Sequence, residues 1–128
     1  AYTNALVTKD ANPEVIGNQV AGATRHIQNA WLGYNFTNPG LKGLKLSLGY
    51  QFQAGRSSWY VFDNTENALP DYFRVDGGIS YNTQQFGINF NVYNLFNEYL
   101  FSGAPYYGIY YWQTEAKRNS RLTISYKF

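Results

Sequence analysis

The chain ends in Arg121-Leu122-Thr123-Ile124-Ser125-Tyr126-Lys127-Phe128, a stretch in which apolar and polar residues alternate without a break. Successive side chains of a β-strand point to opposite faces, so this alternation predicts a strand with two different faces. One face carries Leu122, Ile124, Tyr126 and Phe128, and the other carries Arg121, Thr123, Ser125 and Lys127. An apolar strand face must be covered by either a protein core or lipid, and the rest of the chain decides which.

The same alternation recurs in four earlier segments, which predicts an antiparallel all-β fold of about six strands without helices. The four are Ile27–Phe36, Leu44–Gln53, Asp71–Tyr81 and Phe86–Tyr93, and a less regular strand is expected at Tyr2–Thr8. Long connections at Lys9–His26, Ala54–Pro70 and Glu98–Tyr110 alternate with short ones at Thr37–Gly43 and Asn82–Gln85. Near Asn94-Leu95-Phe96 the alternation slips, which predicts a β-bulge.

Three features favour lipid over a protein core. Long and short connections alternate, as they do in membrane barrels with long outer loops and short inner turns. On the apolar faces, aromatic residues gather near the strand ends with aliphatic residues between them, as in the aromatic girdles of a bilayer-spanning barrel. The charges inside the strands lie on the polar faces, at Lys45, Arg74, Asp76, Arg121 and Lys127. The sequence therefore predicts a transmembrane β-barrel, and because six strands are too few to close one, we expect partner strands at both edges.

Composition and motif content exclude several classes of function. The chain contains no cysteine and a single histidine, His26, and it has no nucleophile, phosphate-binding or metal-ligand motif. We therefore expect no enzymatic activity, no catalytic residue, no metal site and no cofactor. The net charge of +2 is dispersed over 128 residues, which argues against a nucleic-acid surface.

The stretch Val92-Tyr93-Asn94-Leu95-Phe96-Asn97-Glu98-Tyr99 resembles the C-terminal barrel signature of the TonB-dependent outer-membrane receptors. The resemblance extends back through Leu69–Asp76 and Gly43–Leu46, and forward to Arg118–Leu122 and the terminal aromatic Phe128. It implies a bacterial outer-membrane barrel of about 22 strands with a plugged lumen, driven by the TonB energy-coupling complex. Residues 1–128 would then be the C-terminal segment of this barrel, with the plug domain and the remaining strands absent from the chain.

Aromatic residues in and beside two long connections are the candidate ligand-binding residues. They are Trp59 and Tyr60 in one, and Tyr106, Tyr107, Tyr111 and Trp112 in the other. Rings with polar atoms suit a concave site for an amphipathic metal chelate, although barrel rims are aromatic in any case. Tyr107 and Tyr111 share the parity of Arg121 and would face the lumen if the last strand extended that far without a bulge.

The strands themselves supply further candidate residues. Arg74, Asp76 and Arg121 are expected to face the lumen, where Arg74 and Asp76 either contact the plug or pair with barrel neighbours. Tyr126 and Phe128 are expected to face lipid near the periplasmic rim, and the resemblance implies that they serve as the membrane-insertion signal. Arg118 shares their parity and is expected at the outer interface.

The resemblance implies active uptake of a scarce ligand, and we expect a ferric siderophore. Two alternatives remain open. One is a glycan or peptide importer of the same family that works with a surface lipoprotein, and the other is a soluble carbohydrate-binding β-sandwich with exposed aromatic residues. The expected partners are outer-membrane lipid, the other strands and plug of the receptor, the TonB complex and the iron–siderophore ligand. Nucleic acid is not among them.

Overall fold

The structure is a computed structural model that describes residues 1–60, 66–106 and 109–128; at residues 58–60, 66–67, 104–106 and 109–111 it describes the backbone. Its strands are β1 (Thr24–Asn35), β2 (Leu44–Tyr60), β3 (Glu66–Leu69), β4 (Tyr72–Asn82), β5 (Phe86–Tyr93), β6 (Phe101–Tyr106), β7 (Ile109–Thr114) and β8 (Asn119–Tyr126). Two short 3-10 helices, η1 (Pro13–Val15) and η2 (Pro39–Leu41), complete the described elements. Among the described residues, no helix has the length and apolar character needed to cross a membrane.

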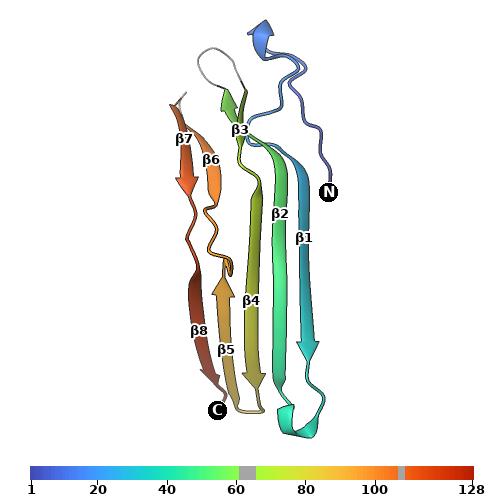
Figure 1. The fold of residues 1–128 in the computed structure, drawn as a ribbon, viewed down its shortest axis with the longest axis vertical. Helices are drawn as coiled ribbons and strands as arrows, with labels where there is room; N and C mark the ends of the chain where they lie inside the picture. Colours follow the sequence, from blue (N-terminus) through green and yellow to red (C-terminus); the bar gives the residue numbers. More distant parts are fainter. Residues whose placement is uncertain (61–65, 107–108) are drawn as a thin grey trace. The chain divides into compact units, whose positions relative to one another are not determined.

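The main sheet has the strand order β1-β2-β4-β5-β8, with β3 paired to β2, while β6 and β7 form a separate two-stranded sheet (Figure 1). The five strands of this order confirm five of the six predicted strands, and β5 has the bounds that the alternation predicted. We call the five strands β1, β2, β4, β5 and β8 the wall. Neighbouring wall strands are joined by the connections that the sequence identified, which are short between β4 and β5 and long between β5 and β8.

The strand predicted at Tyr2–Thr8 is wrong. This segment forms two isolated bridges, Tyr2 with His26 and Leu6 with Gln19, because its two halves pair with different parts of the chain. The N–H of Thr3 donates to the Arg25 carbonyl, whereas the N–H of Val7 donates to the Asn18 carbonyl. The predicted all-β class is confirmed, and the described helices are two three-residue 3-10 helices that the alternation did not reveal. The first, η1, begins with Pro13 after Asn12, whose side chain accepts the Glu14 N–H at 3.1 Å.

The two long connections predicted at Ala54–Pro70 and Glu98–Tyr110 contain strands. In the first, β2 continues to Tyr60 and pairs with β3, so that Arg56 lies opposite Leu69 and Ser57 opposite Ala68. In the second, β6 and β7 form a hairpin whose register runs from Phe101↔Thr114 to Tyr106↔Ile109. Both are local antiparallel pairings that satisfy backbone groups without a continuous apolar face, which is why the alternation pattern did not reveal them.

The chain forms two compact units. Unit 1 contains Ala1–Gln28, Phe52–Phe73 and Tyr99–Glu115, and unit 2 contains Asn29–Gln51, Arg74–Glu98 and Ala116–Phe128. Unit 1 has a small core in which the buried apolar residues are Val15, Leu69, Tyr72 and Leu100. The buried side chain of Gln19 links its own segment to β2, because its Nε2 donates to the carbonyls of Ala23 at 3.0 Å and Gly55 at 2.9 Å.

Unit 2 consists of wall strands whose register keeps like residues on the same face. Ile79 lies opposite Phe90 in the β4–β5 pair, and Phe90 lies opposite Leu122 in the β5–β8 pair. On the other face, Asn91 lies opposite Gly78 on one side and Arg121 on the other. The register confirms that the alternation in the sequence becomes one apolar and one polar face.

Candidate functional site

The apolar face of unit 2 is exposed. Leu32 is 74% exposed, Leu122 60% and Ile124 62%, which are values of surface residues rather than of core residues. The same face carries further exposed apolar residues: Leu46, Leu48, Ile79, Tyr81, Phe86, Ile88, Phe90, Tyr126 and Phe128. An exposed apolar surface that spans several strands marks a site that binds lipid or another apolar partner.

Aromatic residues of this face meet one another at the strand ends beside the short turns. At the end of β1 the rings of Tyr34 and Phe36 lie 5.0 Å apart. Tyr126 lies 5.6 Å from Phe86 across the β5–β8 pair and 5.2 Å from Phe128, in edge-to-face arrangements. Such a row of rings at one end of a strand wall suits a membrane–water interface, where aromatic rings are favoured. The expected lipid-facing parity of Tyr126 and Phe128 agrees with this placement, and their insertion role stays a prediction.

The polar face of unit 2 is shaped by glycines. The indole ring of Trp31 covers Gly49 so closely that a Cβ atom at position 49 would overlap the ring. Asn29, Trp31, Gly49, Gln51 and Asp76 of this face, with the neighbouring Ala30 and Tyr50, line an open depression of about 300 Å³. Because the depression presents amide and carboxylate groups beside an indole, it suits a polar protein surface better than lipid.

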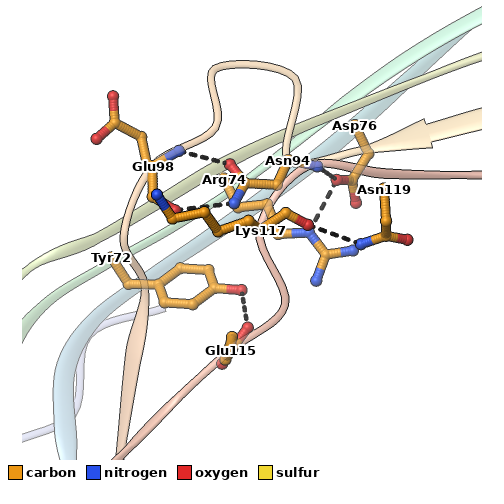
Figure 2. A network of polar contacts seen from close by, with 8 residues as sticks. All are labelled: Tyr72, Arg74, Asp76, Asn94, Glu98, Glu115, Lys117 and Asn119. Carbon is orange, nitrogen blue, oxygen red and sulfur yellow. Dashed lines mark hydrogen bonds and ion pairs between the residues drawn. The ribbon is translucent and has the colours of Figure 1, made fainter.

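Arg74 and Asp76 pair with each other on this polar face. The Nε of Arg74 donates to Oδ1 of Asp76 at 2.8 Å, and the guanidinium lies 5.6 Å from the centre of the Tyr93 ring. Asp76 Oδ1 also accepts the backbone N–H of Asn94 at 2.9 Å (Figure 2). The sequence left open whether these charges contact a plug or their barrel neighbours, and these contacts favour a role within the wall.

The chain turns at Asn94–Glu98, where the alternation slips, so the predicted bulge is wrong. Asn94 and Asn97 both have left-handed backbones, with φ of 56° and 59°, which asparagine tolerates better than most residues. The buried side chain of Asn94 donates to the Glu98 carbonyl at 2.9 Å and accepts the Glu98 N–H at 3.0 Å. The turn is tied to β4 by the Leu95 N–H, which donates to the Val75 carbonyl at 2.8 Å.

In unit 1, three residues that the sequence analysis did not single out as a site form a second polar cluster. Arg56 donates to the Pro70 carbonyl at 3.1 Å and its guanidinium lies 5.3 Å from the centre of the Tyr72 ring. The hydroxyl of Tyr72 donates to Glu115 Oε2 at 3.0 Å (Figure 2). Glu115 directly follows β7, and its N–H donates to the Leu100 carbonyl just before β6, so the cluster anchors the base of the β6–β7 hairpin.

Arg56 lies in β2 beyond Leu44–Gln53, the part of this strand that the sequence predicts to span the membrane. Burial lowers the pKa of Arg56, while Glu115, Tyr72 and Asp71 oppose this shift electrostatically. The guanidinium still stays charged at neutral pH, because the ordinary pKa of arginine is so high. No separate signal in the sequence marks this cluster, since its members come together only when β2, β4 and the end of β7 meet.

The candidate ligand-binding residues that the structure describes lie on two hairpins, β2–β3 and β6–β7. Trp59 and Tyr60 end β2, Tyr106 ends β6, Tyr111 and Trp112 belong to β7, and Tyr107 lies outside the described residues. The ring of Trp112 packs against Phe101 at 5.6 Å and remains 41% exposed. The condition for placing Tyr107 and Tyr111 on the face of Arg121 was an uninterrupted strand, and this condition is not met, because β7 ends at Thr114 and β8 begins at Asn119. In the part of the chain that the structure describes, no cluster of three or more side chains suits a metal ion.

Comparison with known families agrees with a two-faced strand wall of this kind. The family model for the β-barrel of TonB-dependent receptor-like proteins matches residues 1–95. No curated protein matches the chain. The match is to a barrel, so the alternative of a soluble sandwich is not supported, and the exposed apolar face of unit 2 agrees with this. The chain belongs to the TonB-dependent receptor family, whose members are transporters of the bacterial outer membrane, and it matches the β-barrel domain of that family.

Proposed function

We propose that the receptor to which this barrel wall belongs imports a ferric siderophore, with energy from the TonB complex. The family is a transporter family, which supports uptake as the general activity. The ligand is inferred from the aromatic residues of the two hairpins, because rings with polar atoms suit an amphipathic metal chelate.

The observation that carries this proposal is the position of the β6–β7 hairpin in the chain. In the sequence it lies between β5 and β8, which are neighbours in the sheet, and so it belongs to one of the long connections. Long connections of membrane barrels are extracellular, where a receptor meets its ligand. The segment Tyr106–Trp112 contains Tyr106, Tyr107, Tyr110, Tyr111 and Trp112, a high density of aromatic rings for seven residues.

The polar face would line the lumen and meet the plug of the same receptor. Arg121, opposite Asn91 in the β5–β8 register, is on this face together with the Arg74–Asp76 pair. Arg74 and Asp76 would hold the wall in shape, and the depression beside Trp31 would provide room for a polar plug surface.

The test is uptake of radiolabelled iron bound to a panel of siderophores, in iron-starved cells that express the whole receptor. We expect energy-dependent uptake that is lost when TonB is deleted. Burying one ring contributes about 1.5–3 kcal/mol, so Tyr107→Ala with Tyr111→Ala should weaken ligand binding by more than about tenfold at unchanged surface abundance. Tyr2→Ala is the matched control, since Tyr2 is an exposed tyrosine outside both hairpins.

Unchanged binding in the double variant would assign these rings to the barrel rim. Uptake of oligosaccharides or peptides, with no siderophore of the panel transported, would overturn the proposal that the ligand is a ferric siderophore. It would favour a glycan or peptide importer that works with a surface lipoprotein.

A further inference from the structure

The polar face of unit 2 carries more basic than acidic charge. Within unit 2, the charged residues of the strands are Lys45 on β2, Arg74 and Asp76 on β4, and Arg121 on β8. Asp76 is already engaged, because its Oδ1 accepts both the Nε–H of Arg74 and the N–H of Asn94. Lys45 and Arg121 are therefore two cations for which the described strands of unit 2 offer no spare carboxylate.

Contacts between neighbouring strands place Lys45 on this polar face. Its side chain lies over Gly33, since a Cβ atom at that glycine would be 3.0 Å from Cε of Lys45. Ser47 shares the parity of Lys45, and its Oγ donates to the Gly78 carbonyl at 3.3 Å. A Cβ atom at Gly78 would lie 2.8 Å from the same hydroxyl, so Ser47 and position 78 belong to one face. Lys45 therefore projects from the face to which Gly78 belongs.

The register carries the same face across to Arg121. Gly78 lies opposite Asn91 in the β4–β5 pair, and Asn91 lies opposite Arg121 in the β5–β8 pair. Lys45 and Arg121 are both exposed. Among the residues that the structure describes, no hydrogen bond or ion pair engages the ammonium of Lys45 or the guanidinium of Arg121.

A further strand of the barrel cannot supply a carboxylate beside Lys45. β2 lies between β1 and β4, so both neighbours are already in place. At the level of Lys45, the N–H of Phe36 donates to the Leu44 carbonyl on one side, and the N–H of Asn82 donates to the Gly43 carbonyl on the other. A charge that protein covers without a partner is unfavourable. The surface that covers this face therefore has to supply the counter-charge.

The spacing of the two cations indicates an extended partner. Lys45 and Arg121 are three strands apart in the order β2-β4-β5-β8, which at about 4.8 Å per strand amounts to about 14 Å. An ion pair requires its charged atoms within about 4 Å of each other. A single carboxylate or phosphate group does not reach both cations, whereas a protein surface with two acidic side chains does.

We propose that the plug docks on this face through an acidic surface, with one carboxylate at Lys45 and another at Arg121. This inference rests on the proposed contact between the polar face and the plug, and it does not depend on the transported ligand. Complementary charges of this kind fix the register in which two surfaces meet. Arg121 suits a paired hydrogen bond to a carboxylate, and Lys45 supplies a point charge.

Carbodiimide cross-linking of the purified whole receptor, followed by peptide mass spectrometry, tests the pairing. The reagent joins an amine to a carboxylate in contact with it, so we expect an amide between Lys45 and an acidic residue of the plug. Arg121→Lys introduces a second amine and should link to a different acidic residue of the plug. Lys42, an exposed cation in the short turn between β1 and β2, is the control and should form no such link. Links from Lys45 to barrel strands, or to the plug no more often than from Lys42, would overturn the proposal.

A photo-reactive side chain at Thr123 separates this inference from the contact on which it rests. Thr123 is an uncharged residue of the polar face, opposite Asn89. Benzoylphenylalanine in its place captures a neighbouring chain whatever the charge of that chain. Capture of the plug there, without a carbodiimide link at Lys45, would refute the acidic surface and leave the contact with the plug standing. Failure to capture the plug would refute both.

The variant Lys45→Gln with Arg121→Gln should raise the rate at which a protease cleaves the plug by about tenfold, because loss of the charged pairs favours the undocked plug. Lys45→Arg with Arg121→Lys keeps both charges and should retain most of the protection. Lys42→Gln is the matched control. Heat-modifiable gel mobility verifies that the barrel of each variant is folded, and an unchanged cleavage rate in the folded glutamine variant would overturn the proposal.

Discussion

Oδ1 of Asp76 accepts the backbone N–H of Asn94, so that a carboxylate on β4 holds the residue that directly follows β5. Asn94 is almost completely buried, and removal of this acceptor leaves its N–H without a partner. We expect Asp76→Ala to lower the free energy of unfolding by about 1–3 kcal/mol. Urea unfolding of the whole receptor in micelles measures the change. Asp76→Asn keeps an acceptor oxygen and should cost less, so equal losses in the two variants would contradict this role.

Gly49 is expected to be sensitive to a single added methyl group. Because the Trp31 ring covers Gly49, the variant Gly49→Ala must displace the indole, at a cost of about 1–3 kcal/mol. The tryptophan fluorescence maximum of the receptor should shift with it. In a Trp31→Ala background the same substitution should be nearly neutral, and additive effects would argue against the contact. Gly40→Ala is the control, since a Cβ atom there meets nothing within 4 Å.

The two faces of β8 should respond oppositely to charge. Ile124, opposite Ile88 in the middle of the apolar face, should lose about 2–4 kcal/mol of stability when changed to lysine. The neighbouring Thr123 lies on the polar face, opposite Asn89, and Thr123→Lys should be tolerated. Membrane yield and resistance to urea in lipid vesicles report both effects. Similar losses at the two positions would mean that the apolar face does not meet lipid.

The Tyr72–Glu115 hydrogen bond should control the β6–β7 hairpin. Tyr72→Phe keeps the ring beside Arg56 but removes the hydroxyl that donates to Glu115, a loss of about 1.5–3 kcal/mol for a bond to a charged acceptor. Hydrogen exchange at the Glu115 amide, which bonds to Leu100, should become faster. Tyr2→Phe removes a hydroxyl from an exposed ring and should leave this exchange rate unchanged.

The terminal aromatic residue is expected to act during membrane insertion. Phe128 is fully exposed and its ring packs edge-on against Tyr126. Deletion of Phe128 from the whole receptor should reduce its amount in the outer membrane, while Lys127→Gln, on the polar parity, should not. Normal assembly without Phe128 would refute the insertion role.

The faces of the wall were predictable from sequence, because lipid on one side and water or protein on the other impose a period of two. Leu122, Ile124 and Tyr126 have the parity that their register with β5 confirms. The turn after β5 was detected as a slip in parity but was misinterpreted as a bulge. Two asparagines, Asn94 and Asn97, both tolerant of left-handed backbones, were the signal for a turn.

The hairpins and the cluster at Arg56 were beyond the same reasoning. β3 and β6–β7 are local backbone pairings, and their residues show no apolar stripe that a periodicity search detects. Tyr72 and Glu115 lie 43 positions apart. A local sequence pattern does not predict a hydrogen bond between two side chains so distant in sequence. Such contacts follow from the order of the strands, which sequence periodicity does not encode.

β5 and β8 pair along Phe86–Tyr93 and Asn119–Tyr126, although residues 94–118 separate them in the chain. The register of these two strands is set by their own facing residues, so a different intervening segment that leaves and returns at the same two places should preserve it. We therefore expect substitutions between Tyr99 and Ala116 to leave the register of β5 with β8 intact. In protein engineering, this segment could be replaced by another one joined at the Asn94–Glu98 turn and at Arg118.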